Sequence, residues 1–176
     1  REEALLFGAA ADLRLRNWTD GLLSSAQQDD FDTHAMLMFA WCRLADKNRT
    51  AALDWVSENG FPSDGDPQRR RLVPAMMYVI QHSANHLAAV STLRNAAEKR
   101  FSAGELSPYF FAQILDIERS AFDGVQVVGS LTSCEGEHAV FDPPLADEAA
   151  ADRTRRAYGL ATPDRYLESA SRRCKS

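Results

Sequence analysis

Apolar residues recur at every third or fourth position between Pro74 and Arg100, which predicts one long helix over residues 74–100. Its only proline is the first residue, a position that the first turn of a helix tolerates. Apolar side chains cover so much of the circumference that we expect this helix in the middle of a bundle. Two histidines, His82 and His86, lie on its otherwise apolar stripe.

The same period predicts three further helices, over about residues 2–26, 33–59 and 108–123. Ser107 and Pro108 suit the N-cap and the first position of the last of these helices. Gly60 and Gly124 stand where the second and the last end. Short connections make consecutive helices antiparallel neighbours. The sequence therefore predicts an all-α fold, an antiparallel four-helix bundle formed by residues 1–128.

The composition changes from Gly129 onwards, where prolines and charged residues separate the few large apolar ones. One short helix over residues 145–158 is predicted there, and the rest of residues 129–176 is expected to be an irregular tail. Ordering such a segment costs about 1–2 kcal/mol per residue, so another surface must stabilise it. That surface is either the bundle or another chain. We favour a protein partner, because about 120 residues can already close a bundle core.

Size and charge exclude several classes of function. The 176-residue chain has a formal net charge of −5, which argues against nucleic-acid binding. No segment approaches about 18 consecutive apolar residues, so we expect a soluble protein without a membrane span. Three cysteines without a CxxC pair favour a reducing compartment, although a Cys134–Cys174 pair stays open. The sequence begins at Arg1 rather than at Met, as expected of a processed protein or an excised domain.

The two histidines raise the question of a metal site. His82 and His86 have the i, i+4 spacing that allows two imidazoles on one helix face to share a metal ion. Their segment, HSANHLAAVSTLR, resembles the HxxxH helix of the DinB-like metal-dependent thiol transferases. The resemblance implies a divalent transition metal and a third ligand from the second helix, where His34 is the candidate.

The predicted hairpin of the second and third helices places His34 about 20 Å from the level of the other histidines, at 1.5 Å per residue. The same arithmetic brings Asp12 of the first helix and Glu118 of the last near that level. The candidate metal ligands are therefore Asp12, His82, His86 and Glu118. The alternative is that each histidine is a polar core residue that donates to a carboxylate or a carbonyl.

A second resemblance involves arginines. The segment LADKNRTAALDWVSENG resembles the first helix of the nitrate- and nitrite-sensing (NIT) domains, with Arg49 at that family's arginine position. The segment that begins HLAAVSTLR resembles a later helix of the family, with Arg94 at the arginine position. The resemblance implies that Arg49 and Arg94 bind a small oxyanion inside a helical bundle. A guanidinium suits that role because it offers parallel donors and keeps its charge. The alternative is a pair of surface arginines that contact carboxylates on their own helices.

The sequence contains no GxGxxG, P-loop, GxSxG, HExxH or CxxC motif. Our leading hypothesis is therefore a non-catalytic helical domain for sensing or interaction, which binds nitrate or nitrite or serves as a structural subunit of an assembly. The alternative is a DinB-like metal-dependent transferase that uses His82 and His86. The sequence leaves open whether the protein is an enzyme.

Overall fold

The computed structural model describes residues 6, 8–11, 14, 31–67 and 69–175, and only the backbone of residues 31–38. Its elements follow the chain in this order: α2 (Phe31–Asn59), α3 (Leu72–Gln81), α4 (Leu87–Ser102), α5 (Pro108–Asp123), β1 (Thr132–Glu135), β2 (His138–Phe141), α6 (Glu148–Ala157), α7 (Pro163–Ser171) and the 3-10 helix η1 (Arg172–Lys175). Residues 6, 8–11 and 14 are also helical, while the rest of the first predicted helix lies outside the described residues. This segment contacts α2, because the Asn48 side-chain amide donates to the Gly8 carbonyl at 3.1 Å.

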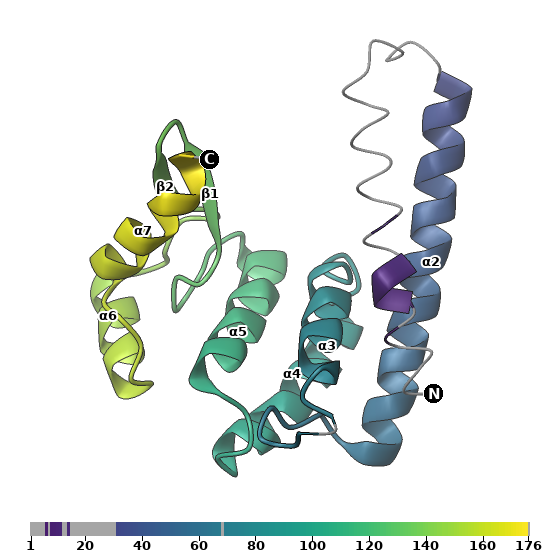
Figure 1. Ribbon diagram of the computed structural model, residues 1–176, viewed down its shortest axis with the longest axis horizontal. Coiled ribbons are helices and arrows are strands. Elements are labelled where there is room, and N and C mark those ends of the chain that lie inside the picture. Colours follow the sequence, from purple (N-terminus) through teal and green to yellow (C-terminus); the bar gives the residue numbers. More distant parts are fainter. Residues whose placement is uncertain (1–5, 7, 12–13, 15–30, 68, 176) are drawn as a thin grey trace.

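The fold is mostly helical, as predicted, with one small two-stranded sheet. Helices α3, α4 and α5 lie between α2 on one side and the C-terminal elements on the other (Figure 1). Contacts join α4 to α5, α2 to both α3 and α4, and α3 to α5. A four-helix bundle is not confirmed, because the third predicted helix is two helices.

The prediction of one helix over residues 74–100 is wrong, because the chain leaves helical geometry between His82 and His86. His82 is the C-cap of α3 and His86 the N-cap of α4. A turn separates the two caps, in which His86 N–H donates to the Ser83 carbonyl at 2.7 Å. The Ser83 side chain is buried in that turn. The two imidazoles therefore do not share one helix face.

The helix ends that rest on local chemistry are where the sequence places them. The Ser107 hydroxyl accepts from Phe110 N–H at 3.5 Å, and Pro108 is the first residue of α5. Gly124 ends α5 with a φ of 68°, and Gly60 follows α2 with a φ of 71°. Few residues other than glycine adopt this left-handed conformation without strain.

The core lies between α2, α3, α4 and α5. Its largest fully buried apolar side chains include Phe61, Leu72, Met76, Ile80, Leu93 and Ile114. At one edge Phe101 stacks on Phe111 with ring centroids 4.4 Å apart, and Tyr158 packs edge-on against Phe101 at 5.0 Å. Because Tyr158 is the C-cap of α6, the C-terminal segment completes the core of the preceding helices.

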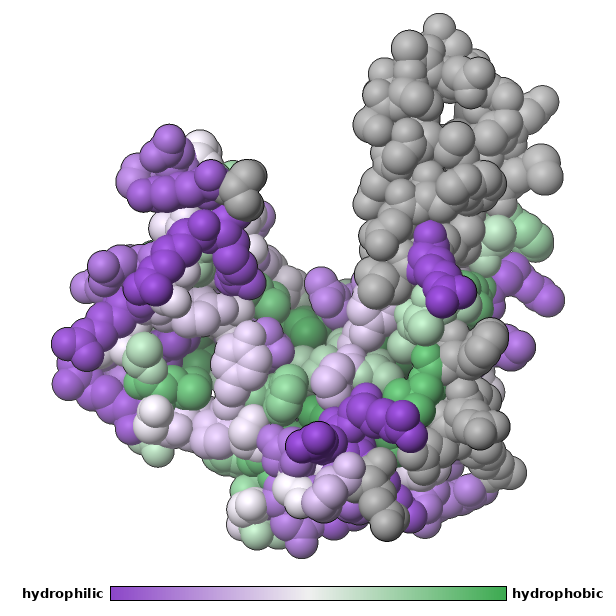
Figure 2. Space-filling view, viewed as in Figure 1, coloured by the Kyte–Doolittle hydropathy of each residue, from purple (hydrophilic) through white to green (hydrophobic). Residues whose placement is uncertain are grey.

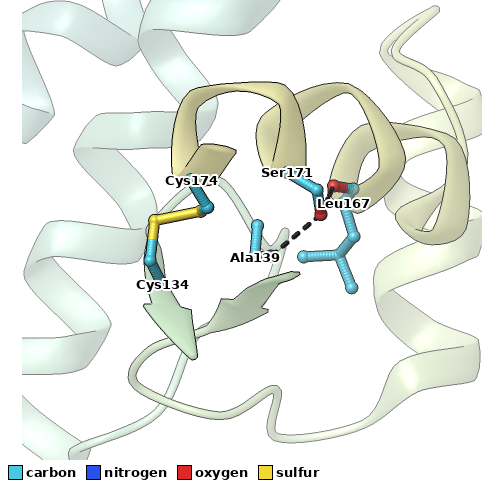
Figure 3. The surroundings of a disulfide bond; sticks show 5 residues. All are labelled: Cys134, Ala139, Leu167, Ser171 and Cys174. Carbon is cyan, nitrogen blue, oxygen red and sulfur yellow. Dashed lines mark hydrogen bonds between the residues drawn. A yellow bond between two sulfur atoms is a disulfide. The ribbon is translucent and has the colours of Figure 1, made fainter. Parts of the chain in front are cut away.

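The prediction of an irregular tail is wrong. Strands β1 and β2 form an antiparallel hairpin, and α7 packs against β2. A disulfide joins Cys134 in β1 to Cys174 in η1 (Figure 3). Beside it, Ala139 N–H donates to the Ser171 hydroxyl at 2.9 Å. The short helix predicted over residues 145–158 corresponds to α6.

Asp116 of α5 connects this C-terminal segment to the helices. Its carboxylate is fully buried and accepts three backbone hydrogen bonds of 2.7–2.8 Å, from Val127, Val128 and Ser130. Three backbone donors compensate for most of the cost of burying the charge. The carboxylate therefore fixes the loop between α5 and β1.

Arg155 of α6 contacts the same loop from the other side. Its guanidinium donates to the carbonyls of Gly129, at 2.7 Å, and Val128, at 3.3 Å, and lies 4.6 Å from the ring centroid of Tyr166. The Tyr166 hydroxyl donates to the Ser130 carbonyl at 2.7 Å. Burial lowers the pKa of Arg155 and raises the pKa of Tyr166. Polar contacts thus supply the stabilisation that the few apolar side chains of this segment cannot.

None of the helices in the described part of the chain is both long and apolar enough to cross a membrane. The Cys134–Cys174 bond resolves the pairing that the sequence left open. Disulfides persist mainly in oxidising compartments, so this bond gives no support to the expected reducing compartment.

Candidate functional site

A cavity of about 460 Å³ lies between α2 and the turn that separates α3 from α4. Its walls consist of Trp41, Cys42, Ala45, Asp46, Arg49, Gln81, His82, Ala84, Asn85 and His86. We refer to it as the α2 cavity. It brings together Arg49, His82 and His86, which the sequence assigned to two different sites.

Arg49 is more deeply buried than Asp46, the acidic residue of this wall. Its side chain is 15% exposed, and Nη2 donates to Asp46 Oδ1 at 2.7 Å. Among the residues that the structure describes, Asp46 is the one hydrogen-bond partner of this guanidinium. In the described part of the chain the other guanidinium donors have no partner, so they can donate to an acceptor in the cavity.

The two histidines have different surroundings. His86 is exposed, and its Nε2 lies 3.8 Å from the same Asp46 Oδ1 that contacts Arg49. The His82 ring lies edge-on to Tyr78 at 4.0 Å and to Trp41 at 6.5 Å between centroids. His86 therefore belongs to the polar part of the wall and His82 to an aromatic part.

The sequence-predicted metal site is not assembled in the described part of the chain. There, no group of three His, Cys, Asp or Glu side chains is close enough to share an ion. Glu118 instead accepts from Arg94 Nε at 2.9 Å and from the Ser91 hydroxyl at 2.8 Å. Asp12 lies outside the described residues, as does the His34 side chain.

Arg94, the second arginine of the predicted oxyanion site, is not in the wall of the α2 cavity. It contacts two carboxylates, Glu118 at 2.9 Å and Glu98 at 2.6 Å. The first of these contacts joins α4 to α5. Both arginines therefore make the ion pairs of the alternative, and Arg49 differs from Arg94 in that it also lines the cavity.

Asp46 and Trp41 also line the cavity, although neither is among the candidate site residues selected from the sequence. The spacing of Asp46 and Arg49 does predict their ion pair, because residues three apart are neighbours on a helix. The approach of His86 to Asp46 depends on the break after α3. No glycine or proline marks that break, so the sequence carried no signal for it.

A different arginine, Arg100, lines two further cavities near the end of α2. Its guanidinium donates to the Phe61 carbonyl at 2.7 Å and to the Asn59 carbonyl at 3.2 Å, and it pairs with Glu105. These contacts satisfy the carbonyls at the C-terminal end of α2. They give Arg100 a structural role.

Comparison with known proteins gives no assignment, because no family model, no curated protein and no solved structure matches this chain. The function must therefore be argued from the chemistry of the α2 cavity.

Proposed function

We propose that this protein is a non-catalytic helical binding domain that takes a small planar oxyanion, such as nitrate or nitrite, in the α2 cavity. The observation that carries the proposal is the position of Arg49. This guanidinium is largely buried, lines the cavity and has donors without a partner among the described residues. The sequence resemblance to nitrate- and nitrite-sensing domains points to the same arginine.

The physical case rests on charge and shape. A guanidinium presents parallel N–H groups to a planar anion, and these charge-assisted bonds are stronger where water is partly excluded. His82 and His86 line the same wall. Trp41 and Ala45 provide apolar surface in the same wall.

Calorimetric titration with sodium nitrate and sodium nitrite tests the proposal. We expect saturable binding to the wild type, and a loss of at least about tenfold in affinity for Arg49→Gln, because one charged hydrogen-bond donor is removed. Arg43→Gln is the matched control, since Arg43 is an exposed arginine on the same helix outside the cavity wall. Arg94→Gln should retain binding, since Arg94 does not line the cavity. The absence of heat from millimolar anion would overturn the proposal.

The DinB-like metal-dependent transferase is the second candidate, because His82 and His86 both line the cavity, although the described residues bring no third ligand close enough to share an ion with them. Elemental analysis of the purified protein tests it. A near-stoichiometric transition metal that is lost in His82→Ala would favour this candidate over the anion site. Less than about 0.1 equivalent of metal would remove it.

A protein partner and a role as a structural subunit were inferred from a tail that could not order itself. In the structure this segment packs on its own chain through the Cys134–Cys174 disulfide, Asp116 and Arg155. The original reason for a partner therefore no longer applies, and we place ligand binding ahead of assembly.

A further inference from the structure

Asp46 lies between two cationic or potentially cationic groups of the α2 cavity. The same oxygen, Oδ1, accepts from Arg49 Nη2 at 2.7 Å and lies 3.8 Å from His86 Nε2. The first distance is a hydrogen bond and the second is beyond one. Asp46 thus binds one donor of Arg49, Nη2, and lies close to a second possible donor, the His86 ring.

The Asp46 carboxylate is also able to move. Its side chain is 56% exposed, in contrast to the 15% of Arg49. Within the described chain, Arg49 and His86 are the two groups its carboxylate contacts, and the hydrogen bond of the Thr50 hydroxyl goes to the Asp46 backbone carbonyl instead. Rotation of the Asp46 side chain towards His86 therefore breaks only the hydrogen bond to Arg49.

We propose that Asp46 is an intramolecular competitor for the anion site: its carboxylate occupies Arg49 in the ligand-free protein and moves to His86 when an anion binds. This inference rests on the proposed function. It assigns to Asp46 the control of affinity and of ligand class. A carboxylate is itself a planar, singly charged oxyanion, so the ligands that replace it at Arg49 share that geometry and charge.

The titratable and charged groups around Asp46 come from both sides of the cavity. The α2 side of the cavity contributes Cys42, Asp46 and Arg49, and the turn between α3 and α4 contributes His82 and His86. Among the described residues, Asp46 is the one carboxylate in this wall. Bound anion and Asp46 would repel each other at Arg49, and the approach of the carboxylate to His86 relieves that repulsion.

The experiment compares nitrate binding by the wild type, Asp46→Asn and Asp54→Asn. Asp54→Asn is the matched control, because Asp54 is an exposed carboxylate on the same helix outside the cavity wall. We expect Asp46→Asn to bind nitrate about tenfold more tightly, since a charged competitor is removed. Asp54→Asn should stay within about twofold of the wild type, because a distant exposed charge is screened. Asp46→Ala should reproduce the gain and serves as the second variant.

A second readout follows the movement of Asp46 rather than the affinity. In the wild type, nitrate should shift the ring nitrogen resonances of His86 in NMR spectra as the carboxylate arrives. In Asp46→Asn this shift should be smaller. Equal or weaker nitrate binding by Asp46→Asn, or identical His86 shifts in both proteins, would overturn the inference while the anion site stands.

The outcomes separate the two proposals. Nitrate binding by the wild type without a gain in Asp46→Asn overturns the competitor and leaves the anion site standing. Nitrate binding by neither protein overturns the anion site and the competitor together.

Discussion

The Asp116 carboxylate shows how one residue fixes the relation of two parts of the chain. It is fully buried and accepts from three backbone N–H groups in the loop after α5. In the sequence it reads as an ordinary polar residue on an amphipathic helix. Its role depends on a loop that begins eight residues later, at Gly124, and local periodicity carries no information about that loop.

We expect Asp116→Asn to lower the free energy of unfolding by about 3 kcal/mol, because an amide has a single acceptor oxygen and its NH₂ group would face backbone donors. Asp123→Asn is the control, since it alters only an exposed i, i+4 ion pair with Arg119, for which we expect about 0.5 kcal/mol. Chemical denaturation of both variants gives the measurement. Equal losses would show that the buried carboxylate has no special role.

Two tyrosines of the C-terminal segment make stability depend on alkaline pH. Burial, with a smaller contribution from Glu98, raises the pKa of Tyr158 above its ordinary value of 10.0, and burial also raises the pKa of Tyr166. The folded state therefore retains these protons at a pH where the unfolded chain releases them. Stability is fully present below pH 10 and falls as the pH rises through the folded-state values. Denaturation midpoints between pH 8 and about 11.5 should show a smaller alkaline loss in Tyr158→Phe than in the wild type; parallel curves would contradict this.

At the scale of elements, the sequence predicted those whose ends have local chemical signals. Helix α5 runs from Pro108 to Asp123, as Ser107, Pro108 and Gly124 indicate, and α2 ends before Gly60. The break between α3 and α4 has no such signal, since QHSANH contains neither glycine nor proline. The hairpin and α7 were missed for a different reason, because a distant disulfide and buried polar contacts compensate for their thin hydrophobicity.

The candidate site was predictable to a similar extent. Arg49, His82 and His86 were all selected from the sequence, and the structure places them in one cavity. The sequence grouped them differently, because it paired His82 with His86 on one continuous helix and Arg49 with Arg94 by resemblance. Glu118 was selected for the level it reaches along the bundle and Arg94 for its position in a sequence resemblance, and neither criterion says which partners the side chain contacts.

The disulfide makes a testable contribution to the C-terminal elements. It joins residues that are 40 positions apart, and a crosslink of that span restricts the unfolded chain by about 4 kcal/mol in the chain-entropy model. We expect Cys134→Ser with Cys174→Ser, or reduction by a dithiol, to lower the melting temperature by several degrees. Cys42→Ser should leave it unchanged, because Cys42 is a free and exposed thiol. A melting temperature that is insensitive to reduction would contradict a stabilising role.

At the scale of the whole molecule, residues 129–176 form an arm on the opposite side of α3, α4 and α5 from α2, and Figure 2 shows apolar residues on the surface between the arm and these helices. Helices α3, α4 and α5 connect the two sides (Figure 1). The α2 cavity belongs to α2 and the turn before α4, whereas the disulfide belongs to the arm. Ligand binding and the redox state of the arm are therefore expected to be separable.

Removal of residues 129–176 tests whether the arm is part of the folded unit. Tyr158 and Leu131 pack against the core, and the rings of Phe101 and Phe111 would lose their aromatic neighbour Tyr158. We expect the truncated chain to melt several degrees below the full chain, because this apolar surface becomes exposed. The wild type should be monomeric in sedimentation experiments. A truncated chain that keeps its melting temperature but loses an assembly would support the protein partner, which we place behind ligand binding.

The central claim is that Arg49 binds a planar oxyanion in the α2 cavity, and side-chain NMR of arginine tests it most directly. Nitrate is titrated into isotopically labelled wild-type protein while the Nε–H resonances of Arg49, Arg94 and Arg43 are followed. We predict a saturable shift of the Arg49 resonance, with no comparable shift for Arg94 or Arg43. An Arg49 resonance that stays unchanged at millimolar nitrate, or a shift that is equal for all three arginines, would contradict the account.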